Sequence, residues 1–185
     1  MQFKTVLVGT CVMLFGIGTA FAQLKSGPAA DSEVSGFKVH AITGEFADKD
    51  VDYPKERQEK TTIYLFIAAD KWDRPIARYL KKLDKAVTDG IEGTKEVEVV
   101  AVWLTEDATK SKEYLPKAQK SLKFEHTALA VFPGAKQGPD GWGIDTEAHL
   151  TTVVVKGQKV VASFGYRSTN ETDVEEVVKS LKPVP

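Results

Sequence analysis

Two long runs of apolar, β-branched and aromatic residues, separated by one amphipathic segment, constrain this chain most. Residues 61–69 and 97–104 are nearly continuous in such residues, a pattern typical of strands buried on both faces of a sheet. Between them an apolar stripe recurs at helical spacing. Its members are Ile76, Leu80, Leu83 and Val87. Strand, helix and strand in this order predict a right-handed parallel crossover and therefore an α/β fold.

The predicted helix has signals at both ends. Asp73 can cap its first turn, Pro75 fits that turn, and Gly90 can end it. A second helix is expected from Asp107 to about Leu122, with Pro116 kinking or splitting it. Its inward residues are expected to be Tyr114, Leu115, Ala118 and Leu122.

Shorter elements are expected on both sides of this unit. Residues 37–41 alternate in polarity and turn at 42–45, which predicts a short edge hairpin. The charged stretch 48–60 is expected to be a surface connection. Residues 129–132 form a strand candidate, followed by a loop over 133–147.

The end of the chain predicts a hairpin and a helix. The hairpin pairs residues 151–155 with 160–164. The helix is expected to begin at Thr169 or Asn170 and to stop at Pro183. Its inward residues are expected to be Val174, Val177, Val178 and Leu181.

The first residues have the pattern of a cleavable export signal. Lys4 precedes an apolar run over 6–17, and Ala20-Phe21-Ala22 has small residues where signal peptidase requires them. We expect a signal peptide over 1–22, an extended leader over 23–35 and one domain over 36–183. The protein is then exported, periplasmic or secreted, with no membrane span after cleavage. A retained membrane anchor is the alternative.

The only cysteine, Cys11, lies inside the predicted signal. The exported protein would therefore carry no thiol and no disulfide, and its stability would depend on an ordinary hydrophobic core. Basic and acidic residues nearly balance, at 25 and 26, and they are interspersed. This balance gives no reason to expect a nucleic acid as partner.

The order of the elements resembles the thioredoxin-like superfamily. Three segments add to the resemblance: Gly27-Pro28 before residues 37–44, the strand 64–69, and Gly141-Trp142-Gly143-Ile144. They are similar to the exported thiol-disulfide oxidoreductase and peroxiredoxin-like branch. The resemblance implies a three-layer α/β fold, with a central mixed β-sheet flanked by helices and an N-terminal β-hairpin.

The chain departs from this family at the functional positions. Where the family has Cys-x-x-Cys at a helix start, this chain has residues 70–75, Asp-Lys-Trp-Asp-Arg-Pro. The counterpart of the family's cis-proline is Leu150, for which we expect a trans bond because a cis bond would cost roughly 3 kcal/mol. We therefore expect no thiol exchange and no peroxide reduction.

The same loop is still a candidate binding site. Trp72, Asp73, Arg74 and Pro75 lie where thioredoxin folds meet their partners, and aromatic and arginine residues are enriched at binding hot spots. The alternative is structural: Asp73 caps the helix, Arg74 is solvated, and Trp72 packs on the sheet edge.

Three further residues are expected on the surface that carries the loop 70–75. Trp142, His149 and Leu150 are expected beside the loop, where the first two would line a shared groove. His149 is otherwise a structural residue. The three histidines come from separate elements and have no spacing typical of metal ligands, so we expect no metal and no cofactor.

These observations favour a redox-inactive module that binds a protein or peptide partner in the cell envelope through the former active-site face. One alternative is a non-thiol enzyme or ligand-binding protein that uses the same groove. Another is a structural or assembly module. Enzymatic activity has no positive support in the sequence.

Overall fold

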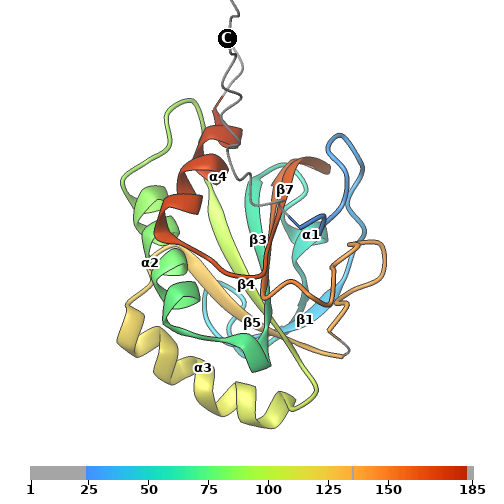
Figure 1. Ribbon diagram of the computed structural model, residues 1–185, viewed down its shortest axis with the longest axis vertical. Helices are drawn as coiled ribbons and strands as arrows, with labels where there is room; N and C mark the ends of the chain where they lie inside the picture. The colour runs from blue at the N-terminus through green and yellow to red at the C-terminus, as the bar shows by residue number, and fades with distance from the viewer. Residues whose placement is uncertain (1–23, 135, 183–185) are drawn as a thin grey trace, which may run out of the picture.

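A computed structural model describes residues 24–134 and 136–182 of the 185-residue chain. The expected signal peptide, Cys11 and Pro183 lie outside these residues. Within them the chain forms one mixed sheet of seven strands with helices packed against it (Figure 1). No helix in the described part is long and apolar enough to cross a membrane.

The elements alternate much as the sequence predicts. The strands are β1 (Lys38–Ala41), β2 (Asp50–Asp52), β3 (Thr61–Ala68), β4 (Glu98–Thr105), β5 (Thr127–Pro133), β6 (Leu150–Lys156) and β7 (Lys159–Tyr166). The helices are α1 (Tyr53–Glu56), α2 (Arg74–Thr88), α3 (Ala108–Leu122) and α4 (Val174–Leu181), with 3-10 turns η1 (Ala69–Lys71) and η2 (Glu171–Asp173).

The strands lie in the order β2-β1-β5-β4-β3-β6-β7. The three central strands β3, β4 and β5 are parallel, and the strands on both sides pair antiparallel. The predicted crossover β3–α2–β4 is therefore confirmed. Because parallel strands end together, the loops after β3, β4 and β5 meet at one edge of the sheet.

The sheet is buried on both faces, which explains the continuous apolar runs. Ile63, Leu65 and Ile67 of β3 face the core under α2, α3 and α4. Tyr64 and Phe66 belong to the core on the other face. This face is covered by α1 and several loops (Figure 1). Successive residues of a strand point to opposite faces, so one strand supplies both cores.

The residues that begin and end the helices are mostly those that the sequence predicts. The Asp73 carboxylate accepts a hydrogen bond from the Ile76 amide at 3.0 Å, and Gly90, at φ +87°, follows the end of α2. Asp107 caps α3 through the Lys110 amide at 2.9 Å. Asn170, not Thr169, caps the turn before α4, and its side chain forms a capping box with Asp173.

Both predicted hairpins are present, and one expected loop is not. Residues 48–60 contain the edge strand β2 and the helix α1, and are not only a surface connection. Asp52 caps α1, Tyr53 is fully buried, and Arg57 is nearly so. The many charged residues of this segment led to the prediction of a surface connection, although Tyr53 and Arg57 are buried.

The helix α3 differs from its prediction in two ways. It runs through Pro116 without a break, because Pro116 is exposed and the carbonyl group that lacks a donor can bond to water. Tyr114 points outward, with 41% of its surface exposed, and only Leu115 and Ala118 of the predicted stripe are fully buried.

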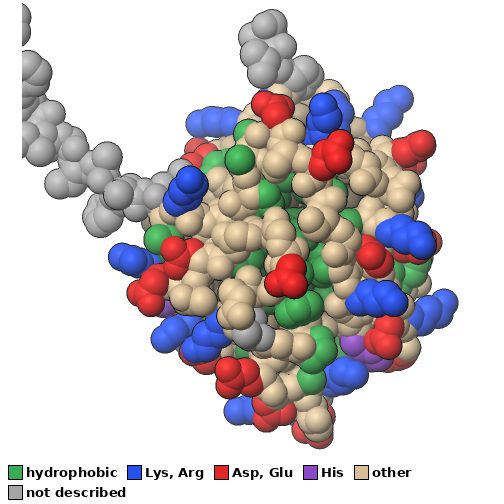
Figure 2. All heavy atoms as spheres, turned by 90° about the vertical axis from the view of Figure 1, so that its right-hand side faces the viewer, with side chains coloured by type: hydrophobic (Ala, Val, Ile, Leu, Met, Phe, Trp, Pro, Cys, Tyr) green, Lys and Arg blue, Asp and Glu red, His purple; other side chains and the backbone are tan. Residues whose placement is uncertain are grey.

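The leader packs against the domain. The Asp31 amide donates to the Val160 carbonyl at 2.8 Å, and the Val34 amide donates to the Gln158 carbonyl at 3.0 Å. These bonds cover the outer edge of β7, which would otherwise be open to pairing with another strand. On the face shown in Figure 2, acidic and basic side chains are mixed and lie mainly toward the periphery, with hydrophobic and uncharged groups between them.

Candidate functional site

The candidate loop, residues 70–75, connects β3 to α2. After Ala68 the chain makes the turn η1, passes Trp72 and enters α2 at Arg74. It therefore lies at the carboxyl edge of the parallel strands, where α/β folds bind their ligands. Asp73, Arg74 and Pro75 are exposed, and Trp72 is half-buried.

Trp72 links this loop to two other elements. Its indole N–H donates to the Tyr114 hydroxyl of α3 at 2.8 Å. Its ring lies 4.8 Å from the ring of Trp103 in β4, tilted by 55°. An aromatic side chain held on both sides loses little conformational freedom when a partner contacts it, which favours binding.

A cavity of about 550 Å³ opens on one side of Trp72, and we call it the Trp103 cavity. Its lining residues come from the ends of β3 and β4 and from the start of α3. They are Ala69, Asp70, Trp72, Trp103, Leu104, Thr105, Glu106, Asp107, Lys110, Ser111, Tyr114 and Lys136. The buried hydroxyls of Thr105 and Ser111 bond to each other at 3.1 Å.

Two carboxylates at this cavity, those of Asp70 and Asp107, are engaged by other groups. The Lys136 ammonium lies 2.7 Å from Asp70, and this hydrogen bond holds the pKa of the Asp70 carboxyl below its usual value. The same bond raises the pKa of Lys136. Asp107 is engaged as a helix cap. Asp70 is therefore unsuited to donate a proton near neutral pH.

A second cavity, of about 490 Å³, lies on the other side of the Trp72–Tyr114 bond, and we call it the α2–α3 groove. It is lined by Trp72, Asp73, Arg74, Ala77, Tyr114, Lys117, Ala118, Ser121 and Leu122. Trp72 is thus flanked by two hollows at the surface where the sequence places the candidate site.

Trp142 and Leu150 do not belong to this site, contrary to the prediction. Trp142 is fully buried on the opposite face of the sheet, against Phe37 and Tyr64. Leu150 is fully buried in the core under the helices. The described residues contain no cis peptide bond, so the trans bond expected at Leu150 is confirmed.

His149 lies at the predicted edge of the sheet, but both of its backbone polar groups are used in hydrogen bonds to neighbouring strands. Its amide donates to the Tyr166 carbonyl at 2.8 Å, and its carbonyl accepts from the Ala68 amide at 3.1 Å. An extended ligand therefore cannot pair with this residue through main-chain bonds. The side chain is half-buried and lines neither cavity beside Trp72. No group of three metal-ligating side chains occurs among the described residues.

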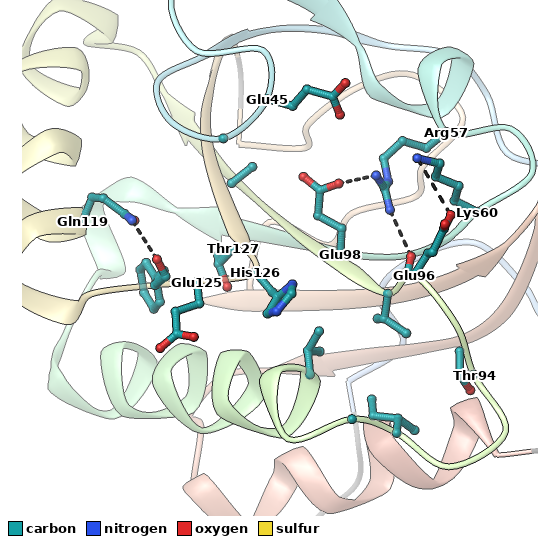
Figure 3. A pocket seen from close by; sticks show the side chains of 17 residues that line it. Glu45, Arg57, Lys60, Thr94, Glu96, Glu98, Gln119, Glu125, His126 and Thr127 are labelled. Carbon is teal, nitrogen blue, oxygen red and sulfur yellow. Dashed lines mark hydrogen bonds and ion pairs between the residues drawn. The ribbon is translucent and has the colours of Figure 1, made fainter.

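A third cavity, of about 500 Å³, lies at the opposite end of the sheet (Figure 3). Its main feature is an ion pair between Arg57 and Glu98, whose side chains are 6% and 20% exposed. Arg57 also donates to the Thr62 hydroxyl at 2.8 Å and to two backbone carbonyls. Burial raises the pKa of Glu98, and the Arg57 charge opposes that rise. The two central charged groups, Arg57 and Glu98, are therefore engaged with each other.

The sequence missed several residues around Trp72. Trp103 was assigned only to a buried strand, Tyr114 was expected to point inward, and Lys117 carried no assignment. The sequence does contain a signal that Tyr114 points outward: it shares a helical face with the charged residue Lys117, three positions later. The local sequence pattern does not indicate which face of α3 contacts the loop at Trp72.

Comparisons with known proteins agree on the fold. No protein-family model and no curated protein matches the chain. A candidate thiol:disulfide interchange protein DsbE from Chlorobium tepidum superposes with a TM-score of 0.62 and 17% identity, over 83% of this chain and 95% of that one. A secreted thiol-disulfide isomerase from Corynebacterium glutamicum gives 0.60 and 13%, over 80% and 84%.

A peroxiredoxin-like protein from Aquifex aeolicus gives a TM-score of 0.54 at 16% identity, over 86% of this chain and 89% of that one. The predicted three-layer fold with a mixed sheet and an N-terminal hairpin is confirmed. At these identities the likeness extends to the fold alone. The chemistry must therefore be argued from this chain's own residues.

Proposed function

Since the chain has a thioredoxin-like fold, we propose that it is an exported, redox-inactive module that binds a protein or peptide partner at the loop carrying Trp72. Every residue after Cys11 is something other than cysteine. Thiol exchange needs a thiolate as nucleophile, so a chain cleaved after Ala22 would have none.

The observation that carries the proposal is the setting of Trp72. The ring is held by Trp103 and Tyr114 and remains partly exposed. A cavity of about 550 Å³ and another of about 490 Å³ adjoin it. Tryptophan and tyrosine are enriched among the residues that anchor protein interfaces. Asp73 supports the loop by capping α2, so its structural role and a binding role for Trp72 are compatible.

Residues 23–185, purified alone, are expected to reduce insulin disulfides and consume peroxide at the rate of the buffer. The physical reason is the missing sulfur nucleophile. A cysteine-bearing thioredoxin measured beside it is the positive control. Turnover by this chain, or by the full-length chain with a cycling Cys11, would overturn the redox-inactive part of the proposal.

Trp72→Ala is expected to reduce recovery of a specific partner from cell-envelope extracts by about tenfold or more, since hot-spot truncation costs 2 kcal/mol or more. Quantitative mass spectrometry of the captured proteins measures this. Val161→Ala, an exposed apolar position on β7, is the matched control. Equal recovery by wild type, control and Trp72→Ala, with all three folded by circular dichroism, would reject binding through this loop.

A further inference from the structure

Positive charge is concentrated on the two helices that border the Trp72 loop. Helices α2 and α3 contain only two acidic residues, Asp84 and Glu113. Their basic residues are Arg74, Arg78, Lys81, Lys82, Lys85, Lys110, Lys112, Lys117 and Lys120. The whole chain has a formal charge of −1, so these two helices are basic while the rest of the chain is net acidic.

Three cations of α2 are already paired. Arg78 lies 3.7 Å from Glu171, Lys82 lies 3.8 Å from Glu175, and Lys85 lies 2.9 Å from Asp89. Arg74 and Lys117, which line the α2–α3 groove, make no ion pair or hydrogen bond through their side chains within the part of the chain that the structure describes. These two charges are available to a partner.

The groove between these two cations is apolar at its base. Ala77 of α2 and Ala118 and Leu122 of α3 line it, and the Trp72–Tyr114 bond separates it from the Trp103 cavity. Its one acidic lining residue is Asp73, whose carboxylate is engaged by the Ile76 amide. The groove therefore offers apolar surface with positive charge beside it.

We infer that the α2–α3 groove binds an acidic segment of a partner protein that also carries an apolar side chain. This inference rests on the proposed function and names the chemistry of the partner. Carboxylates would pair with Arg74 and Lys117, since Arg binds carboxylates in a bidentate manner. The apolar side chain would lie on Ala77 and Leu122, against the Trp72 ring.

The shape of this surface favours a peptide over an anionic lipid bilayer. The site is a hollow between two helices, whereas an amphipathic helix binds a bilayer through an apolar face that lies flat in the interface. The exposed large hydrophobic residues of the described chain are Tyr114 and Val161, and they lie on α3 and β7. They do not form such a face.

The test measures fluorescence anisotropy with three probes. One labelled peptide alternates Glu and Ser around a central Leu-Phe pair, and a second has Lys in place of each Glu. The third probe is a vesicle containing phosphatidylserine. Wild type is expected to bind the acidic peptide at least tenfold more tightly than the basic peptide or the vesicle, and more weakly as salt is raised.

Two charge-reversed variants locate the site. Arg74→Glu/Lys117→Glu is expected to weaken binding of the acidic peptide about tenfold or more. Lys38→Glu/Lys112→Glu makes the same change in charge at two exposed positions outside the groove, and is expected to change affinity less than about twofold because of screening. Thermal unfolding verifies that both variants fold.

Three results would overturn the inference: no preference for the acidic peptide, equal weakening in both variants, or preferential binding of the vesicle. Its failure can be separated from failure of the proposed function. If Trp72→Ala abolishes partner capture while Arg74→Glu/Lys117→Glu does not, the loop binds a partner of other chemistry and only the acidic assignment is wrong.

Discussion

Trp142→Ala is expected to lower the free energy of unfolding by about 3–5 kcal/mol, the cost typical of removing a large aromatic residue from a core. The Trp142 side chain is fully buried. Its ring lies 5.0 Å from Phe37, 5.1 Å from Tyr64 and 5.0 Å from Phe66. Its indole N–H donates to the Ser35 carbonyl at 2.9 Å, so the variant also leaves that acceptor without its donor.

Urea denaturation followed by circular dichroism measures this loss. Trp72→Ala is the matched control, because it removes the same side chain from a half-exposed position and should cost about 1–2 kcal/mol. A loss below that of Trp72→Ala would contradict the assignment of Trp142 to the core and reopen a role for it at the surface.

Arg57→Met is expected to lower the free energy of unfolding by about 3 kcal/mol at pH 7, because it leaves Glu98 charged and largely buried without its partner. It also removes the donor to the Thr62 hydroxyl. The partly exposed position of Glu98 places the effect at the lower end of the range for buried pairs.

The loss in Arg57→Met should depend on pH. Burial raises the pKa of Glu98 in the folded state, and the Arg57 charge opposes this rise more than any other group does. Removing Arg57 therefore raises the pKa of Glu98 further. A carboxyl whose pKa is higher folded than unfolded adds stability below its unfolded pKa, and this stability is lost as pH rises through its folded pKa. The difference from wild type should therefore shrink as pH falls from 7 toward 4.

Glu98→Gln separates the charge effect from the packing effect. Combined with Arg57→Met, it removes the unpaired carboxylate, so the double variant should be more stable at pH 7 than Arg57→Met alone and should not show its pH dependence. If the double variant is less stable than either single variant, the two residues act independently and the ion pair is not what stabilises this end of the sheet.

The fold was predictable because its signals are local. The apolar runs at 61–69 and 97–104 follow from burial on both faces, and this property belongs to each segment alone. Asp73 and Asp107 cap the helices that follow them, since a cap bonds to amides only three residues away. Order and spacing of such segments then indicated the superfamily.

The candidate site was predictable only in part. Residues 70–75 were placed at the correct edge of the sheet because the crossover unit positions them. The prediction that Trp142 lies beside Trp72 is wrong. Both residues lie in loops near strand ends, and a loop has no periodicity that indicates on which face of the sheet its side chains pack. Tyr114 was expected inside, because apolar spacing cannot distinguish a buried ring from one that bonds to a neighbouring loop.

The sequence by itself determined the order of the strands and helices from β3 onward, the caps that bound the helices and the absence of cysteine from the loop at Trp72. Only the tertiary structure decided that Trp72 meets Trp103 and Tyr114 while Trp142 enters the opposite core, and that Arg74 and Lys117 border one groove. The physical reason is range. Periodicity and capping act within a few residues, whereas a binding surface is assembled from segments that approach each other only when the sheet closes.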